Sequence, residues 1–309
     1  MCSVEHMTTI NFRDCRGHCV MVNRVKKNLL KCLMAVGIAP ALLAPVLAQA
    51  ANEAVWLLTA DHHLLRINAD EPQKVLKRVA LSGLPEGHSL VGIDYRVSRG
   101  VMFALSNHAQ IYTVDTESGA LKPVGKGGEV ASAPLNLLGR QYGFDFNPAA
   151  DRIRVVNDRR QNVRFHPDTG ALAATDPNLR YAESDQHANK SPHIGAAAYT
   201  YNKNNEKLTT NFAIDLNLGT LALQGTRESV VPAVSPNEGV LFTVGALGHG
   251  PLTAASFDIA DVSNRALAVL RPAGRSSTGL YDIDLATGKA RMIGRLPGGK
   301  PILGLAIEP

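Results

Sequence analysis

The chain has 309 residues, of which 45% are hydrophobic and 19% are charged, which excludes a disordered polypeptide and allows one large domain or two ordinary ones. The net charge of +5 first suggests a nucleic acid or a membrane surface as partner, but six of the 32 basic and two of the 27 acidic residues precede residue 51. The remaining 26 basic and 25 acidic residues give a net charge of +1, so we expect no nucleic-acid partner.

The first element in the chain is an expected secretory signal peptide between Met21 and Ala50. It has a basic start, a long apolar run and a final Ala-Gln-Ala, the small residues at which a signal peptidase cuts. A membrane anchor is the alternative, but Pro40 and Pro45 interrupt the apolar run. We expect translation to start at Met21, cleavage to follow Ala50, and the mature chain to reach the periplasm or the outside without a transmembrane anchor.

All cysteines of the chain lie before the expected cleavage site, at Cys2, Cys15, Cys19 and Cys32. The mature chain would therefore have no disulfide, zinc-thiolate site or cysteine nucleophile. A chain without cysteine suits an oxidising compartment, because no thiol in it can mispair.

The remaining sequence, residues 51–309, repeats itself. The phrase "IYTVDTESGALKPVG" at 111–125 returns as "LYDIDLATGKARMIG" at 280–294. Four units open with GIDY, GFDF, AAAY and SFDI, and the third letters are Asp94, Asp145, Ala198 and Asp258. These positions are 51, 53 and 60 residues apart. A period near 50 with short alternating strands is typical of β-propeller blades.

Each unit is interpreted as four antiparallel strands, expected in the second unit at 90–95, 101–106, 111–115 and 121–125. The recurring Asp-x-x-x-Gly is the turn of the outer hairpin, where glycine takes a positive φ. In the third unit His166 stands in the Asp position, which favours a turn residue over a ligand. In the fourth unit the turn comes early, so we expect strands at "NFAIDL", "TLALQG" and "VLFTVGALG".

The ends of the chain complete each other. It finishes with the opening strand "ILGLAIEP" and begins, after the signal, with three strands that lack an opener. Pairing 302–307 with the first strands would close the ring and remove its exposed edges. We predict an all-β fold, one propeller domain over 51–309, with five four-stranded blades at 54–87 plus 302–309, 88–125, 141–176, 193–248 and 254–298. Six blades are the alternative if the fourth unit divides, and we expect a monomer.

Several of these phrases, "GIDYRVSRGVMFAL", "NVRFHPDTGAL", "LFTVGALG" and above all "GFDFNPAADRIRVV", resemble a secreted bacterial family, the domain of unknown function 4394. The resemblance covers about residues 56–307. It implies an extracytoplasmic propeller and brings no reaction, cofactor or catalytic residue with it. Ala198 and Ala306 stand where other units have Asp, so a five-fold acidic ring would be incomplete.

The strongest candidates for a site are Asp94, Asp145 and Asp258, at equivalent positions on the innermost strands. They could converge in the central channel on a polar ligand or on a cation such as Ca²⁺. Alternatively, each satisfies a neighbouring backbone N–H and recurs because the blade recurs, which is the interpretation we favour. Strand alternation alone does not tell which face these side chains take.

Two other segments are candidates. His187 and His193 flank the polar connection "HANKSPH" and would form a binding loop. The segment "DRIRVVNDRRQNVR" alternates Arg152 and Arg154 with apolar residues, which is typical of a half-exposed strand and compatible with an anionic ligand.

We find no set of nucleophile and base in the sequence; "GHSLVG", for example, leads into a strand and not into the helix of a nucleophile elbow. The sequence favours a non-catalytic binding or scaffolding module for a small molecule or a protein, with no required cofactor. The alternative is a metal-assisted propeller hydrolase, or a lactonase-like enzyme, whose channel cation is held by the three aspartates.

Overall fold

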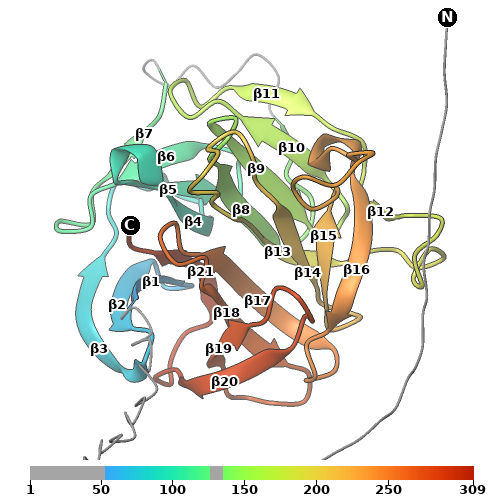
Figure 1. Ribbon diagram of the computed structural model, residues 1–309. Coiled ribbons are helices and arrows are strands. Elements are labelled where there is room, and N and C mark those ends of the chain that lie inside the picture. Colours follow the sequence, from blue (N-terminus) through green and yellow to red (C-terminus); the bar gives the residue numbers. More distant parts are fainter. Residues whose placement is uncertain (1–52, 126–134) are drawn as a thin grey trace, which may run out of the picture. The chain divides into compact units, whose positions relative to one another are not determined.

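The computed structural model describes residues 53–125 and 135–309; the expected signal peptide lies outside them. In this part of the chain the strands form five separate sheets, arranged as the blades of a ring (Figure 1). No helix within the described residues is long and apolar enough to cross a membrane. The predicted all-β propeller of five blades is confirmed.

Three blades are built from four consecutive strands, with the first strand innermost. Blade 2 contains β4 (Leu90–Arg96), β5 (Val101–Ser106), β6 (Ile111–Val114) and β7 (Leu121–Pro123). Blade 3 contains β8 (Tyr142–Asn147), β9 (Arg152–Asn157), β10 (Asn162–Phe165) and β11 (Leu172–Thr175). Blade 5 contains β17 (Leu252–Ile259), β18 (Ala266–Pro272), β19 (Gly279–Ile283) and β20 (Ala290–Arg295). The strands expected for the second unit agree with these bounds to within two residues.

Blade 4 explains the irregular spacing of the fourth unit. It runs β13 (Ile194–Tyr199), β14 (Asn211–Asp215), β15 (Thr220–Gln224) and β16 (Val240–Ala246), as one sheet. A fifth strand, β12 (Arg180–Tyr181), pairs in parallel with β16 on the outside, and no repeat of the sequence predicts it. The long unit does not divide, so the six-blade alternative is wrong.

Blade 1 joins the two ends of the described chain. Its strands β1 (Ala54–Thr59), β2 (His63–Asn68) and β3 (Glu71–Ala80) follow one another, and β21 (Ile302–Ile307) supplies the innermost strand. The register is antiparallel, with Val55 opposite Ile307 and Leu57 opposite Leu305. Figure 1 shows this junction, where the red end of the chain lies against the blue beginning. The predicted closure by the C-terminal strand is confirmed.

The repeated phrase contains a turn, and the Asp that begins this turn stabilises it by accepting hydrogen bonds from the backbone. In blade 2, the carboxylate of Asp115 accepts hydrogen bonds from the backbone N–H groups of Glu117 and Ser118, at 2.9 and 3.0 Å. The chain then reverses at Gly119, where φ is +76° and a Cβ would lie 2.0 Å from the carbonyl oxygen of Ala80. In blade 4 the same turn joins the second and third strands instead of the third and fourth, which is why it comes early.

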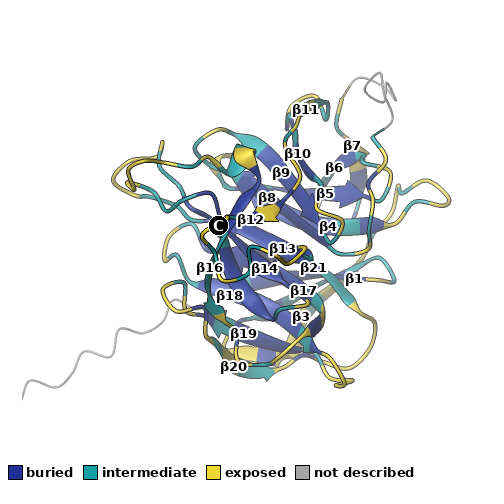
Figure 2. Ribbon diagram, turned by 90° about the vertical axis from the view of Figure 1, so that its right-hand side faces the viewer, coloured by how far each residue is buried: buried dark blue, intermediate teal, exposed yellow. Residues whose placement is uncertain are grey.

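The inner strands are buried along most of their length (Figure 2). Two residues before each Asp or Ala of the repeat stands a small residue: Gly92, Gly143, Ala196, Ser256 and Gly304. A Cβ on Gly143 would lie 2.6 Å from the backbone nitrogen of Ala197 on the next blade, so the strands approach closely only because this residue is glycine. The remaining space among the inner strands has a volume of about 10 Å³, which is at most the space that a single water molecule needs.

Candidate functional site

Asp94, Asp145 and Asp258 meet at the centre of the ring. Each contributes a carboxylate oxygen to a group whose atoms lie within 4.8 Å of one another, and all three side chains are buried. They come from β4, β8 and β17, the inner strands of blades 2, 3 and 5. We call these three residues the aspartate triad.

The triad links neighbouring blades through the backbone. Each carboxylate accepts a hydrogen bond from the N–H group one position after the equivalent residue of the next blade. Asp94 bonds to Phe146 at 2.7 Å, Asp145 to Tyr199 at 3.0 Å and Asp258 to Ile307 at 2.6 Å. The structural role favoured from the sequence is therefore present in the geometry, and it continues across the closure between blades 5 and 1.

The two blades with alanine at this position show the same principle. Ala306 and Ala198 offer no carboxylate to the next blade, so the N–H groups of Tyr95 and Ile259 lack an inter-blade acceptor. The second oxygens of Asp94 and Asp258 accept these two hydrogen bonds, at 2.7 and 2.6 Å. Three carboxylates thus satisfy one buried N–H group on each of the five inner strands, and two alanines are tolerated without an unpaired donor.

Burial raises the pKa of all three carboxyl groups, because the charged form loses its hydration. The negative charge of Asp258 raises the pKa of Asp94 further, and the charges of both neighbours act in the same way on Asp145. The pKa of Asp258 rises to about 7, although the N–H groups of Ile307 and Ile259 lower it. All three carboxyl groups of the triad therefore keep a proton to higher pH than an exposed aspartate does.

A Ca²⁺ ion at the triad would need about six to eight oxygen ligands. Five of its six carboxylate oxygens accept backbone hydrogen bonds, and within the described residues only Oδ2 of Asp145 accepts none. The space of about 10 Å³ among the inner strands is lined by residues that precede the triad, such as Gly92 and Gly143, and not by the three aspartates. The triad fits a structural clamp better than a calcium site.

Larger hollows lie at the C-terminal ends of the inner strands of blades 2, 3 and 4. One, which we call the larger hollow, has a volume of about 510 Å³ and is lined by parts of 96–98, 146–151 and 201–207. Tyr201 belongs to this lining, and burial together with the charges of the triad raises the pKa of its phenol. Its backbone exchanges two hydrogen bonds with the side chain of Asn264 in blade 5, which fixes its position.

The second cavity, the smaller hollow, has a volume of about 300 Å³ and lies between blades 3 and 4. It shares Asn147, Ala149 and Lys207 with the larger hollow, so the two adjoin on one face of the ring. Its walls come from β9 and β10 and from the loops at 207–209 and 226–237. Neither hollow was predictable from the sequence, because the loops that form them have no recurring pattern.

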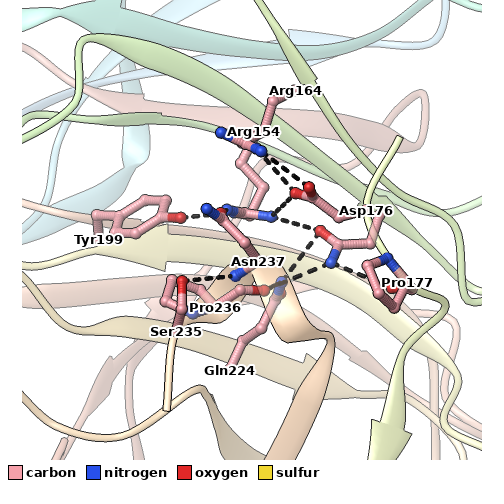
Figure 3. A network of polar contacts seen from close by, with 10 residues as sticks. Arg154, Arg164, Asp176, Pro177, Tyr199, Gln224, Ser235, Pro236 and Asn237 are labelled. Atoms are coloured by element: carbon pink, nitrogen blue, oxygen red, sulfur yellow. Dashed lines mark hydrogen bonds and ion pairs between the residues drawn. The ribbon is translucent and has the colours of Figure 1, made fainter. Parts of the chain in front are cut away.

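Arg154 is buried and lines the smaller hollow, and its polar contacts are drawn in Figure 3. Its guanidinium donates hydrogen bonds to the phenol oxygen of Tyr199 and to the side-chain oxygens of Asn162, Asn237 and Asp176. The expectation of a half-exposed strand was wrong here, since Arg154 is only 2% exposed. β9 is buried on both faces because blade 4 packs against it, and the polar partners of Arg154 compensate for its charge.

The two histidine candidates, His187 and His193, contact different residues and do not form a common site. His187 Nδ1 lies 3.0 Å from the hydroxyl of Thr243, which itself donates to Asp185, so the residue fastens the loop to β16. The backbone N–H of His193 donates to Asp215, and Nδ1 of its ring is buried without a hydrogen-bond partner among the residues that the structure describes. Among the described residues, the aspartate triad is the one group of three potential metal ligands, and neither histidine belongs to it.

Comparison with known families agrees with the repeat and with the geometry of the ring. The family model described as domain of unknown function (DUF4394) matches residues 63–306, which is most of the chain. The chain belongs to this family. No curated protein matches it.

Two solved structures resemble this member of DUF4394 at low sequence identity. One, titled "Crystal structure of Nidogen/Laminin Complex", is 11% identical with a TM-score of 0.44, and the match covers 83% of this chain and 98% of that one. The other is the Kuenenia stuttgartiensis hydrazine synthase, 10% identical with a TM-score of 0.39, over 70% of this chain and 51% of that one. At these scores neither likeness informs the function.

Proposed function

We propose that this protein is an exported β-propeller that binds a ligand without transforming it, as a binding or scaffolding module for a small molecule or a protein. The observation that carries the proposal is the pair of adjoining hollows, of about 510 and 300 Å³, on the face formed by blades 2, 3 and 4. Volumes of this order are typical of small-molecule sites.

The walls of these hollows are held rigidly, which suits recognition. Arg96, at the end of β4, is buried and pairs with both Asp151 and Asp168 of blade 3. Arg154 connects β9 to β13 and to the loop at 226–237 in the same way. A site whose side chains are fixed before binding loses little conformational entropy when the ligand arrives.

The lining favours binding over catalysis. Nucleophilic catalysis most often uses a hydroxyl or thiol within hydrogen-bond reach of a base, commonly histidine. No histidine or cysteine lines either hollow among the described residues. Where a histidine does meet a hydroxyl, at His187 and Thr243, the hydroxyl proton is donated to Asp185 instead.

A ligand screen tests this function with the mature chain, residues 51–309. Panels of sugars, organic acids, amino acids and nucleotides are tested by thermal shift, and mass spectrometry follows each stabilising compound during incubation. We expect at least one compound to raise the melting temperature and to stay chemically unchanged. Ala149→Trp, which fills the shared wall of the hollows, should abolish the shift, whereas Ala273→Trp on an exposed turn of blade 5 should not. Conversion of the compound, or equal shifts in both variants, would contradict the proposal.

Export is a separate part of the proposal, supported by the signal-like segment that ends at Ala50 and by the absence of cysteine after it. Expression of the full chain, fractionation and N-terminal sequencing test it. We expect the periplasmic or secreted product to begin at Ala51. A cytoplasmic product that retains Met21 would refute export.

A metal-assisted hydrolase, or lactonase-like enzyme, is the second candidate function. The convergence of three carboxylates within 4.8 Å favours it, since such a group would hold a channel cation. The hydrogen bonds that engage five of the six oxygens weigh against it. Metal analysis of the triad variant distinguishes the two candidates.

A further inference from the structure

The smaller hollow gathers positive charge that the protein does not neutralise. Among the described residues, the lining has one acidic side chain, Glu228, and five cationic ones: Arg152, Arg154, Arg164, Arg227 and Lys207. Of these, Arg152, Arg227 and Lys207 form no ion pair within the described part of the chain. Like charges brought together in a concave site repel one another, unless an anion from outside joins them.

The remaining two arginines share one carboxylate. Arg164 holds Asp176 through two parallel hydrogen bonds of 2.8 and 2.9 Å, and Arg154 reaches the same group at 3.2 Å. Including Asp176, the site keeps an excess of three positive charges. Burying Arg154 among mainly neutral acceptors is costly for stability, and the fixed guanidinium that results is the kind of group that binds carboxylate and phosphate.

Glu228 provides a second, independent feature in the same cavity. Its Oε1 accepts a hydrogen bond from the side chain of Asn202, whereas its Oε2 is buried and has no partner among the described residues. A buried carboxylate oxygen without a donor is unfavourable. A ligand that supplies a hydroxyl or ammonium group at this point would satisfy it.

We propose that the smaller hollow binds a small organic anion that also carries hydrogen-bond donors, such as a sugar acid or a sugar phosphate. The arginines and Lys207 hold the anionic group, and Glu228 receives a donor from the rest of the ligand. This inference rests on the proposed binding function and names its ligand class. The volume of about 300 Å³ limits the ligand to roughly one sugar unit in size.

Calorimetric titration of the mature chain with four probes tests the two features separately. Gluconate and glucose 6-phosphate combine an anionic group with hydroxyl donors, and they distinguish carboxylate from phosphate. Glucose keeps the donors without the charge, and succinate, which is a dianion like glucose 6-phosphate, has no hydroxyls. We expect one of the first two to bind most tightly, succinate weakly and glucose least, with affinity falling as salt is added.

Two double variants each remove two positive charges, one pair from the hollow and one pair from outside it. Arg152→Gln with Lys207→Gln takes two unpaired cations from the hollow, and should lower the affinity of the best anion about tenfold or more. Arg159→Gln with Arg160→Gln is the matched control, because both residues are exposed on blade 3 outside the hollow. We expect it to change affinity less than about twofold. Glu228→Gln should reduce the preference for the hydroxylated anion over succinate.

Equal losses in the two double variants would overturn the inference, and so would binding of glucose as tight as that of the anions. If a neutral compound binds the hollows and no anion does, the ligand class is wrong while the binding function stands. If no compound of any class binds, the binding function itself fails.

Discussion

Asp258 in β17 accepts a hydrogen bond of 2.6 Å from the backbone N–H of Ile307 in β21. Because β21 also pairs with β1, this bond connects the fifth blade to the first at the point where the ring closes. Asp94 and Asp145 form the equivalent bonds between blades 2 and 3 and between blades 3 and 4. Through these hydrogen bonds between neighbouring blades, the triad stabilises the whole ring.

Removal of the Asp258 carboxylate should destabilise the protein. In Asp258→Ala the N–H groups of Ile259 and Ile307 lose their acceptors in a buried site, so we expect the free energy of unfolding to fall by about 2–5 kcal/mol. Asp258→Asn keeps one acceptor oxygen and should lose less. Urea unfolding measures both, and Asp261→Ala, in the turn that follows β17, is the control. A change in Asp258→Ala no larger than in this control would contradict the clamp.

The raised pKa values of the triad predict an unusual dependence of stability on pH. The pKa of Asp258 rises from 3.8 to about 7 on folding, so between these values the folded state holds a proton that the unfolded state has released. Stability should therefore fall as the pH rises through this window, by roughly 4 kcal/mol for this residue at about 1.4 kcal/mol per pKa unit. Asp258→Asn should flatten the curve.

The control for this pH series is Asp284→Asn. Hydrogen bonds from the turn lower the pKa of the exposed Asp284, so its contribution to stability is lost only as the pH falls below 3.8. Asp284→Asn should therefore leave the pH dependence of stability between pH 4 and 7 unchanged. Parallel pH curves for wild type and Asp258→Asn would show that the carboxylate is not a buried acid.

Gly143 should not tolerate even one methyl group. A Cβ at this position would lie 2.6 Å from the backbone nitrogen of Ala197 and 2.8 Å from its Cβ, which forces blades 3 and 4 apart. We expect Gly143→Ala to lower the free energy of unfolding by about 1–3 kcal/mol, measured by urea unfolding. Gly298→Ala is the matched control, because nothing lies within 4 Å of its added Cβ. Equal stability of the two variants would show that the inner strands are less tightly packed.

The C-terminal strand should be indispensable. Deletion of 302–309 removes the inner strand of blade 1, leaves β1 unpaired on one side and exposes the apolar residues that packed on β21. We expect aggregation or loss of the cooperative unfolding transition. Deletion of 308–309 alone removes a half-exposed ion pair between Arg66 and Glu308, and should change stability by less than about 1 kcal/mol. A stable, cooperative product of the longer deletion would contradict the ring closure.

Much of the fold was predictable because the blade repeats. The Asp-x-x-x-Gly turn and the alternating strands recur, which predicts the repeated units, and the unmatched strand at 302–307 predicts the closure of the ring. The direction of the triad side chains did not follow, since a strand has two faces and the sequence does not say which faces the axis. One signal was available: the small residue two positions before each Asp, such as Gly92 before Asp94, lies on the same face and indicates close approach of neighbouring strands.

The hollows and the burial of Arg154 were beyond prediction for a different reason. Arg154 has the same local pattern as an exposed strand residue, and only the packing of blade 4 and the loop at 226–237 encloses it. These contacts join residues far apart in the chain, such as Arg154 and Asn237, and occur once in the molecule. A repeat pattern carries no information about them.

The nature of the triad is tested most directly by measuring metal in the purified mature chain, with the Asp94→Asn, Asp145→Asn, Asp258→Asn triple variant beside it. If the three carboxylates are clamps between inner strands, neither protein should contain stoichiometric metal after dialysis, chelator should leave the melting temperature of the wild type unchanged, and the triple variant should be less stable. One calcium or other divalent ion per wild-type chain, lost in the triple variant, would contradict this account and favour the metal-assisted enzyme.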